Sequence, residues 1–164
     1  MRLLAKTFHH ISAQWSAGPP EVTDMANLMR EDLPPDLQEW VEREIVYGGR
    51  IYRPDYLSPR FCIEIKRITG NRMDLSARTG MQQLLVYKAA LARGNDDMPS
   101  FVLMLILDQA SAMGGKSIAR ITDEATLLGI EVRYCNHPHA AILTIEGLEL
   151  GTAPDFEELI SDDF

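Results

Sequence analysis

The sequence predicts an α/β fold in which an antiparallel meander continues into a mixed sheet with helices on both faces. Three observations support this. Residues 101–108 are almost continuously apolar, which is typical of a central strand buried on both faces. Residues 117–128 have helical periodicity and precede a second strand at 130–135, an order that favours parallel pairing through a right-handed crossover. Residues 50–67 have the alternation and the turn residues of a β-hairpin.

The remaining elements follow from periodicity and from Pro and Gly breaks. They are, in chain order, helices at 2–16 and 22–29, a helix that Asp36 caps with Glu39 as its capping-box partner, a strand or a last helical turn at 44–47, a helix at 75–92 and a strand at 141–145. We expect a single domain over 1–164. It has a helical extension at 1–35, a core at 36–135, and a C-terminal strand and acidic tail at 136–164.

Composition excludes several classes of protein. The chain of 164 residues has two cysteines, Cys62 and Cys135, which is too few for a four-cysteine iron–sulfur or zinc cluster within one chain. No apolar run has the length of a membrane span, and the first residues lack the features of a signal peptide. These observations favour a cytoplasmic protein with reduced thiols and no membrane partner.

Charge is distributed unevenly along the chain, whose net charge is −8. Residues 43–93 carry ten Lys and Arg against four Asp and Glu, whereas residues 1–42 and 94–164 are both net acidic. The hairpin lies in the basic segment. A basic segment that surrounds a few carboxylates suits a phosphodiester substrate, such as DNA, that arginines hold and a metal-dependent site cleaves.

The second arm of the hairpin has two different faces. The period of two along a strand sends Glu64 and Lys66 to one face, and Ile63 and Ile65 to the other. Two side chains of opposite charge therefore stand next to each other on a strand whose other face is apolar.

The turn sets the position of a second carboxylate. If Ser58 and Pro59 form the centre of the turn, Asp55 is opposite Cys62 and becomes a diagonal neighbour of Glu64, about 7–8 Å away between backbones. Two carboxylates at that separation can share a divalent cation. A nearby ammonium group can orient a water or stabilise negative charge on phosphorus.

These residues resemble the motif of the PD-(D/E)XK nuclease superfamily. The match is Pro54-Asp55 followed by Glu64-Ile65-Lys66 on consecutive strands of a hairpin. The resemblance implies that Asp55 and Glu64 bind Mg²⁺, with Mn²⁺ able to substitute, that the Ile65 carbonyl is a further ligand, and that Lys66 assists the attacking water. The short spacing between the two acids is similar to that in phage-type junction-resolving endonucleases.

The resemblance covers roughly residues 36–135 and implies a restriction-endonuclease-like core. RecB-like members have a Gln-x-x-x-Tyr on the following helix that supports the site and the DNA backbone, and Gln83 and Tyr87 match it. A polar stripe that contains these residues by chance is the alternative. No iron–sulfur cluster is expected, because the four cysteines of RecB-like relatives are missing. Among the arginines of the basic segment, Arg53 and Arg67 are assigned to DNA binding.

Many members of the superfamily have one more acid upstream of the hairpin, and here the candidates are Glu39, Glu42 and Glu44. On a helix that begins at Asp36, Glu44 lies within an apolar stripe, where a carboxylate is costly unless it serves the site. If 44–47 is instead a strand, Glu39 or Glu42 takes that role. A solvated helix is the simpler interpretation.

The first hypothesis is therefore a Mg²⁺-dependent DNA endonuclease or exonuclease of the kind that acts in recombination or repair. Cutting both strands of a duplex needs two sites, so a homodimer or larger oligomer is one expected arrangement. The alternative is a catalytically silent, nuclease-like adaptor that binds DNA, or that docks a basic protein partner through its acidic C-terminal third.

Overall fold

The computed structural model describes residues 22–68, 73–93, 97–107 and 115–152. The elements in this part of the chain are α2 (Val22–Asp32), α3 (Pro35–Gln38), β1 (Ile45–Tyr47), β2 (Arg50–Tyr52), β3 (Tyr56–Leu57), β4 (Phe61–Ile68), α4 (Met73–Ala92), β5 (Ser100–Leu107), α5 (Gly115–Leu127), β6 (Ile130–Cys135) and α6 (Pro138–Leu150). The strands form a four-stranded sheet in the order β3–β4–β5–β6 and a separate two-stranded ladder, β1–β2. The predicted α/β class with a mixed sheet is confirmed.

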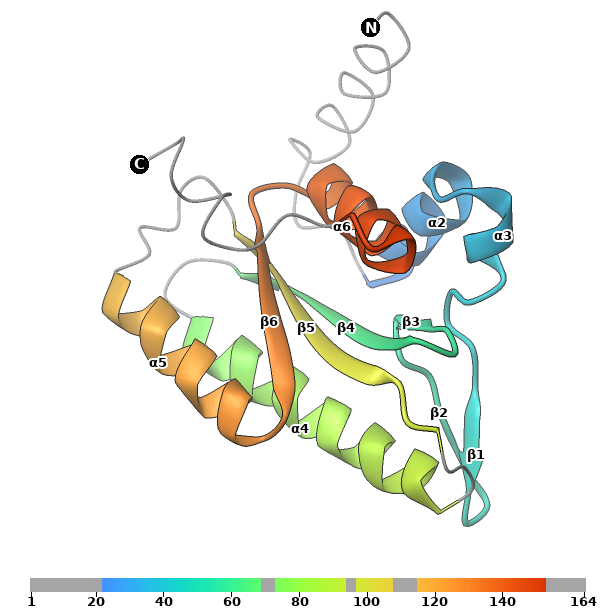
Figure 1. Cartoon of the computed structure of the whole chain (residues 1–164), viewed down its shortest axis with the longest axis horizontal. Coiled ribbons are helices and arrows are strands. Elements are labelled where there is room, and N and C mark those ends of the chain that lie inside the picture. The colour runs from blue at the N-terminus through green and yellow to red at the C-terminus, as the bar shows by residue number, and fades with distance from the viewer. Residues whose placement is uncertain (1–21, 69–72, 94–96, 108–114, 153–164) are drawn as a thin grey trace, which may run out of the picture.

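The central strand of the larger sheet is β5, as its apolar run predicts (Figure 1). All its residues from Phe101 to Ile106 are buried. It pairs in parallel with β4 on one side and with β6 on the other, and Leu103 is in register with both Glu64 and Val132. The predicted parallel pairing of the two apolar strands is therefore confirmed.

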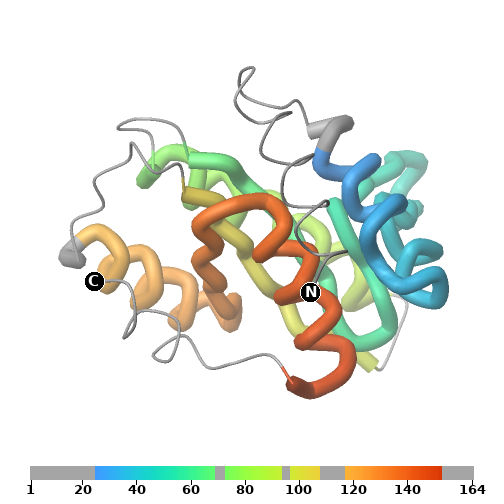
Figure 2. Tube along the Cα trace, turned by 90° about the horizontal axis from the view of Figure 1, so that it is seen from above, coloured from blue at the N-terminus to red at the C-terminus, as the bar shows by residue number. Residues whose placement is uncertain are grey.

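Helices cover both faces of this sheet (Figures 1 and 2). Leu84 of α4 and Ile121 of α5 belong to the apolar cluster on one face. Met29 of α2 and Ile142 of α6 belong to the cluster on the other face. Both parallel crossovers, through α4 and α5, thus lie on the same side of the sheet, and alternate residues of β5 point into each cluster.

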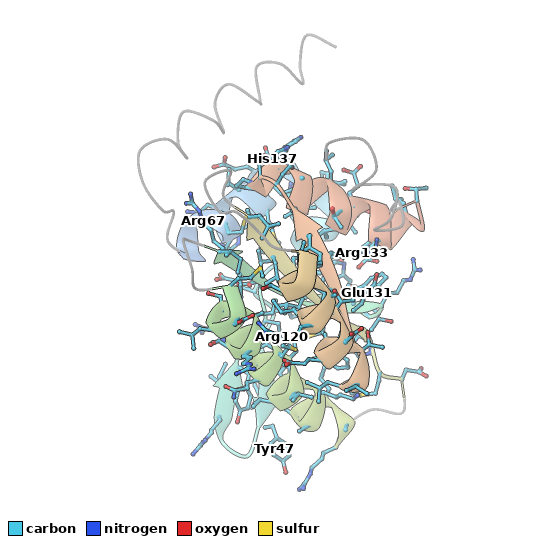
Figure 3. The ribbon with its side chains drawn as sticks, turned by 90° about the vertical axis from the view of Figure 1, so that its left-hand side faces the viewer. Tyr47, Arg67, Arg120, Glu131, Arg133 and His137 are labelled. Atoms are coloured by element: carbon cyan, nitrogen blue, oxygen red, sulfur yellow. The ribbon has the colours of Figure 1, made fainter. Side chains whose placement is uncertain are left out.

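The short hairpin β1–β2 is built around Gly48 and Gly49, whose φ angles are 57° and 75°. Two left-handed residues in a two-residue loop are the signature of a type I′ turn, which glycine adopts without steric cost. The strand favoured for 44–47 is thereby confirmed. The hairpin forms its own ladder instead of extending the larger sheet, and Figure 3 places Tyr47 at the end of the molecule opposite to His137.

The helix expected from Asp36 is wrong beyond its first turn. The N-cap residue is Pro34, which makes no side-chain cap hydrogen bond, so Asp36 and Glu39 do not form the predicted capping box. The helix ends early because the next residues pair with another part of the chain. Val41 forms an antiparallel bridge with Tyr56, so this backbone runs beside β3 instead of continuing the helix.

The strand expected at 141–145 is also wrong, because these residues are the middle of α6. Pro138 occupies the first turn, the His137 Nδ1 atom accepts a hydrogen bond of 3.0 Å from the Ala140 N–H, and left-handed Gly151 ends the helix. Proline inside the start and glycine just past the end are ordinary helix signals. The apolar run between them is short, and its periodicity does not distinguish a buried helix from a strand.

The expected helix at 2–16 and the acidic tail from Pro154 lie outside the described residues. No helix in the described part of the chain combines the length and the apolar content that crossing a membrane requires.

Candidate functional site

The turn between β3 and β4 has Pro59 and Arg60 at its centre. The Ser58 N–H donates to the Phe61 carbonyl at 2.9 Å, which makes these two residues the last pair of the ladder. The Ser58 hydroxyl oxygen accepts from the backbone N–H groups of Arg60 and Phe61 at 3.2 and 3.0 Å. This serine holds the turn through local side-chain hydrogen bonds, so the predicted centre at Ser58 and Pro59 is one residue too early.

The corrected turn changes the register by two residues. Leu57 is opposite Cys62, whereas the sequence predicted Asp55 at that position. Continuing the observed register by two residues aligns Asp55 directly with Glu64, which is closer than the predicted diagonal arrangement. Because the shift is an even number of residues, each side chain stays on its predicted face.

The two faces of β4 are as predicted. Ile63 and Ile65 belong to the apolar cluster under α2 and α6. Glu64 and Lys66 alternate with them and point toward α4. A Cβ atom built at Gly80 of α4 would be 3.2 Å from Lys66 Cγ, so the lysine stem lies against this helix.

The carboxylate of Asp55 is buried and 6% exposed, and its Oδ2 accepts the Ile65 N–H at 2.7 Å. Pro54 would be opposite Ile65 if the register of Tyr56 and Ile63 continued by two residues. Proline has no N–H, so it cannot donate a ladder hydrogen bond to the Ile65 carbonyl. Beyond the last paired residues of β3, the Asp55 carboxylate therefore accepts the Ile65 N–H in place of a backbone carbonyl.

Glu64 is buried as deeply, at 4% exposure, and its two oxygens differ. Oε1 accepts from Lys66 Nζ at 2.8 Å, whereas Oε2 is buried without a hydrogen-bond partner among the described residues. A buried carboxylate oxygen that lacks a partner is costly, and it needs an explanation such as an ion.

The electrostatics of the site show an excess of buried negative charge. Burial and the neighbouring Glu64 carboxylate raise the pKa of Asp55 from 3.8 to about 7, although the Ile65 N–H and Lys66 act in the opposite direction. Burial, followed by the negative charges of Glu64 and Asp55, also raises the pKa of the Tyr87 hydroxyl. The single ammonium of Lys66 does not balance two buried carboxylates.

Helix α4 brings Gln83 and Tyr87 to the same side of the sheet as Glu64. Tyr87 is buried, its ring meets the Tyr52 ring edge-on at 6.4 Å, and the negative charge of Glu64 contributes to the raised pKa of its hydroxyl. The side-chain oxygen of Gln83 is buried without a hydrogen-bond partner within the described chain. Both residues thus share one side of α4, and the supporting role that the Gln-x-x-x-Tyr pattern implied for them stays a prediction.

Sequence reasoning missed the residue that lets α4 approach so closely. A Cβ atom at Gly80 would be 2.4 Å from Leu103 Cδ1, well inside contact distance. Glycine in a helix interior costs about 1 kcal/mol relative to alanine, so a glycine one turn before Gln83 was a usable signal of close packing.

Arg67, which was assigned to DNA, is not on the face of Glu64 and Lys66. It pairs in register with Ile106, which belongs to the cluster under α2 and α6. Alternation along β4 places the Arg67 side chain on that same face. The structure therefore does not bring Arg67 together with the two carboxylates.

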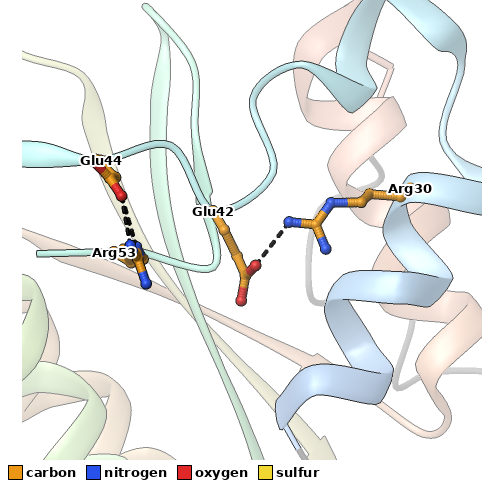
Figure 4. A network of polar contacts seen from close by, with 4 residues as sticks. All are labelled: Arg30, Glu42, Glu44 and Arg53. Carbon is orange, nitrogen blue, oxygen red and sulfur yellow. Dashed lines mark hydrogen bonds and ion pairs between the residues drawn. The ribbon is translucent and has the colours of Figure 1, made fainter.

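Of the three upstream acids, Glu42 lies next to the site. Its N–H donates to the Asp55 carbonyl at 3.0 Å, and its charge contributes to the raised pKa of Asp55. Its φ of 51° is rare for a residue with a side chain and costs of order 1 kcal/mol or more. The carboxylate is paired with Arg30 of α2 at 2.7 Å (Figure 4).

Glu44 and Arg53 are paired with each other. Their ion pair is 2.6 Å long and joins the start of the β1–β2 hairpin to its end (Figure 4). Both side chains are substantially exposed, and so is Glu39. The helix that would have placed Glu44 in an apolar stripe does not form, and Glu42 takes the place beside the site.

The chain matches no known family model, no curated protein and no solved structure. Within the described ranges, no group of three or more His, Cys, Asp or Glu side chains is arranged to hold a metal ion. The candidate ligands are therefore the two carboxylates of Asp55 and Glu64 and the Ile65 carbonyl.

Proposed function

We propose that the chain is a Mg²⁺-dependent deoxyribonuclease with a restriction-endonuclease-like core. The observation that carries the proposal is a pair of buried carboxylates, Asp55 and Glu64, close together at the β3–β4 hairpin, with one Glu64 oxygen that has no hydrogen-bond partner among the described residues. Two ionised, buried carboxylates with one ammonium form an unfavourable arrangement, which a proton on Asp55 or a bound cation relieves. The PD-(D/E)XK-like motif supplies the reaction class.

The residues present suit a magnesium ion. Mg²⁺ prefers hard oxygen ligands in octahedral array and retains several waters, so few protein ligands suffice. Asp55, Glu64 and the Ile65 carbonyl would hold it, since Asp55 contacts the Ile65 backbone and its charge interacts with that of Glu64. Once bound, the ion supplies charge neutralisation at the phosphate and acidifies a water.

The side chains around the carboxylates have distinct roles in this proposal. Lys66 is beside Glu64 at 2.8 Å and is one-fifth exposed, so its ammonium can turn toward an incoming phosphate or orient a water. Tyr87 lies near enough to Glu64 for the two groups to interact electrostatically, and Gln83, one turn before it on α4, is the second residue assigned to support the site. Glu42 is a positioning residue, since its backbone N–H fixes the carbonyl of Asp55.

A cleavage assay tests the proposal. Linear, circular and branched DNA are incubated with Mg²⁺ or Mn²⁺ and either the native chain or the double variant Asp55→Ala/Lys66→Ala. The matched control is Arg78→Ala/Glu124→Ala, which removes an exposed acid–base pair 3.7 Å apart on α4 and α5. We expect cleavage by the native chain and the control alone. Equal cleavage by the double variant would exclude these residues as the catalytic site.

Calorimetric titration with Mn²⁺ distinguishes the enzyme from the adaptor alternative. The enzyme requires a binding heat that Glu64→Ala abolishes, because Glu64 would hold the metal. A native chain that binds DNA but gives no heat with Mn²⁺ or Mg²⁺ would favour the catalytically silent adaptor.

A further inference from the structure

The outer face of the β1–β2 hairpin carries an exposed apolar pair. Val46 and Ile51 are directly opposite in the ladder, so their side chains share one face. They are 70% and 57% exposed, although β-branched residues usually pack. The other face is anchored, since Ile45 is buried in the cluster under α4 and Tyr52 meets Tyr87.

Arginines lie on and beside the hairpin, and Arg50, which pairs with Tyr47, is on the face of Ile45 and Tyr52 next to the turn. Residues 43–53 contain Arg43, Arg50 and Arg53, all exposed, and one acid, Glu44. A fourth cation is added by Arg93 at the end of α4, which donates to the Tyr47 hydroxyl at 2.7 Å. The chain as a whole has a net charge of −8, so this local excess of positive charge is unusual for it. Such a surface suits a polyanionic partner.

The hairpin is continuous with the candidate catalytic residues. Strand β2 ends at Tyr52, and Asp55 follows three residues later. At about 3.3 Å per residue, Ile51 is at most about 13 Å of chain from Asp55. Figure 1 shows the hairpin beside the C-terminal end of α4, the helix that carries Tyr87 to Glu64.

We propose that β1–β2 is a DNA-binding ribbon that enters the major groove of duplex DNA and directs the adjoining backbone toward Asp55 and Glu64. A two-stranded ribbon fits this groove, whose width is about 12 Å. Val46 and Ile51 contact base edges, where the thymine methyl is the apolar group, and the arginines contact the flanking phosphates. A Cβ atom at Gly48 or Gly49 would meet nothing within 4 Å, so the tip is bare. The inference rests on the proposed function in taking DNA as the substrate.

Glu44 limits the charge of this ribbon. Its carboxylate accepts from Arg53 Nη2 at 2.6 Å and from Nε at 3.0 Å, and so occupies a guanidinium that would otherwise face phosphates. Removing this charge releases Arg53. Glu44→Gln therefore strengthens DNA binding, whereas a metal-ligating Glu44 would lose cleavage on the same substitution.

The test measures binding of a fluorescent duplex of about three helical turns, by anisotropy in EDTA over a series of salt concentrations. Arg50→Ala weakens binding and lowers the slope of log K against log[salt] by about 0.9, because one phosphate contact is lost. Val46→Ser/Ile51→Ser weakens binding about tenfold with the slope unchanged. Glu44→Gln tightens binding roughly twofold to fivefold.

Matched controls come from exposed positions on α5. Arg120→Ala removes an exposed arginine, and Leu127→Ser removes an apolar side chain that is 87% exposed; both leave binding unchanged. If the hairpin variants bind like these controls, or if the native chain binds only single-stranded DNA, the ribbon inference is overturned.

This outcome is separable from that of the nuclease proposal. Loss of binding in the hairpin variants, with no cleavage by any form of the chain, would support the ribbon and reject the nuclease. The opposite result is cleavage that depends on Asp55 together with duplex binding that is unaffected by substitution of Val46, Arg50 and Ile51. It would support the nuclease and reject the ribbon.

Discussion

Asp55→Asn removes one of the two buried charges while keeping a side-chain oxygen that can accept the Ile65 N–H. In the metal-free protein the pKa of Asp55 rises from 3.8 to about 7, first because of burial and then because of Glu64. The folded state therefore holds a proton between these pH values that the unfolded chain has released. The contribution of Asp55 to the free energy of unfolding is therefore most favourable at low pH and is lost as the pH rises toward 7.

The magnitude follows from the size of the shift. About three pH units at roughly 1.36 kcal/mol per unit correspond to roughly 4 kcal/mol, an upper value because Asp55 and Glu64 titrate together. Asparagine does not titrate, so the variant lacks this loss. We expect Asp55→Asn to be as stable as the native chain near pH 4 and more stable by up to roughly 4 kcal/mol at pH 8.

The assay is urea unfolding in EDTA from pH 4 to pH 8, with the variant as reference so that other titrating groups cancel. Saturating Mg²⁺ at pH 8 then stabilises the native chain, and not the variant, by about 2.7 kcal/mol at one hundred times the dissociation constant. Parallel pH profiles of the two proteins in EDTA would refute the claim that Asp55 is a destabilised buried carboxylate.

Three further predictions follow from single contacts. Lys66→Met lowers the cleavage rate at least a hundredfold but retains Mn²⁺ binding. Kinetics measures the first effect and calorimetry the second. Loss of both cleavage and Mn²⁺ binding would indicate a purely structural role for Lys66. Gly80→Ala destabilises the fold by about 1–3 kcal/mol in urea, because the new Cβ would meet Leu103 at 2.4 Å; a loss below about 0.5 kcal/mol would show that Leu103 gives way freely. Tyr56→Phe costs about 1 kcal/mol through the lost 2.9 Å hydrogen bond to Glu149, and an unchanged urea midpoint would contradict this.

Much of the site's frame could be predicted because it depends on local rules. The apolar run of β5 and the period of two along β4 are properties of short segments. They correctly placed Glu64 and Lys66 on one face and Ile63 and Ile65 on the other. The same alternation, applied one residue further, already separates Arg67 from the Lys66 face.

The remaining features depend on contacts between distant segments. The register required knowing that Ser58 caps its own turn, which Ser-Pro alone does not specify. The end of α3 and the position of Glu42 depend on pairing between residues 40–42 and 55–57, a tertiary interaction that overrides helix periodicity. Helix α6 was misassigned because an apolar segment buried in a layered fold has little amphipathic period.

The most direct test of the central claim is a crystal structure of the native chain soaked with Mn²⁺, with the metal located by its anomalous scattering. The proposed site predicts a peak within about 2.0–2.3 Å of oxygens from Asp55, Glu64 and the Ile65 carbonyl, with waters completing the octahedron. A peak elsewhere would contradict the proposal. So would a well-diffracting crystal, soaked at a high Mn²⁺ concentration, that shows no anomalous peak between these oxygens.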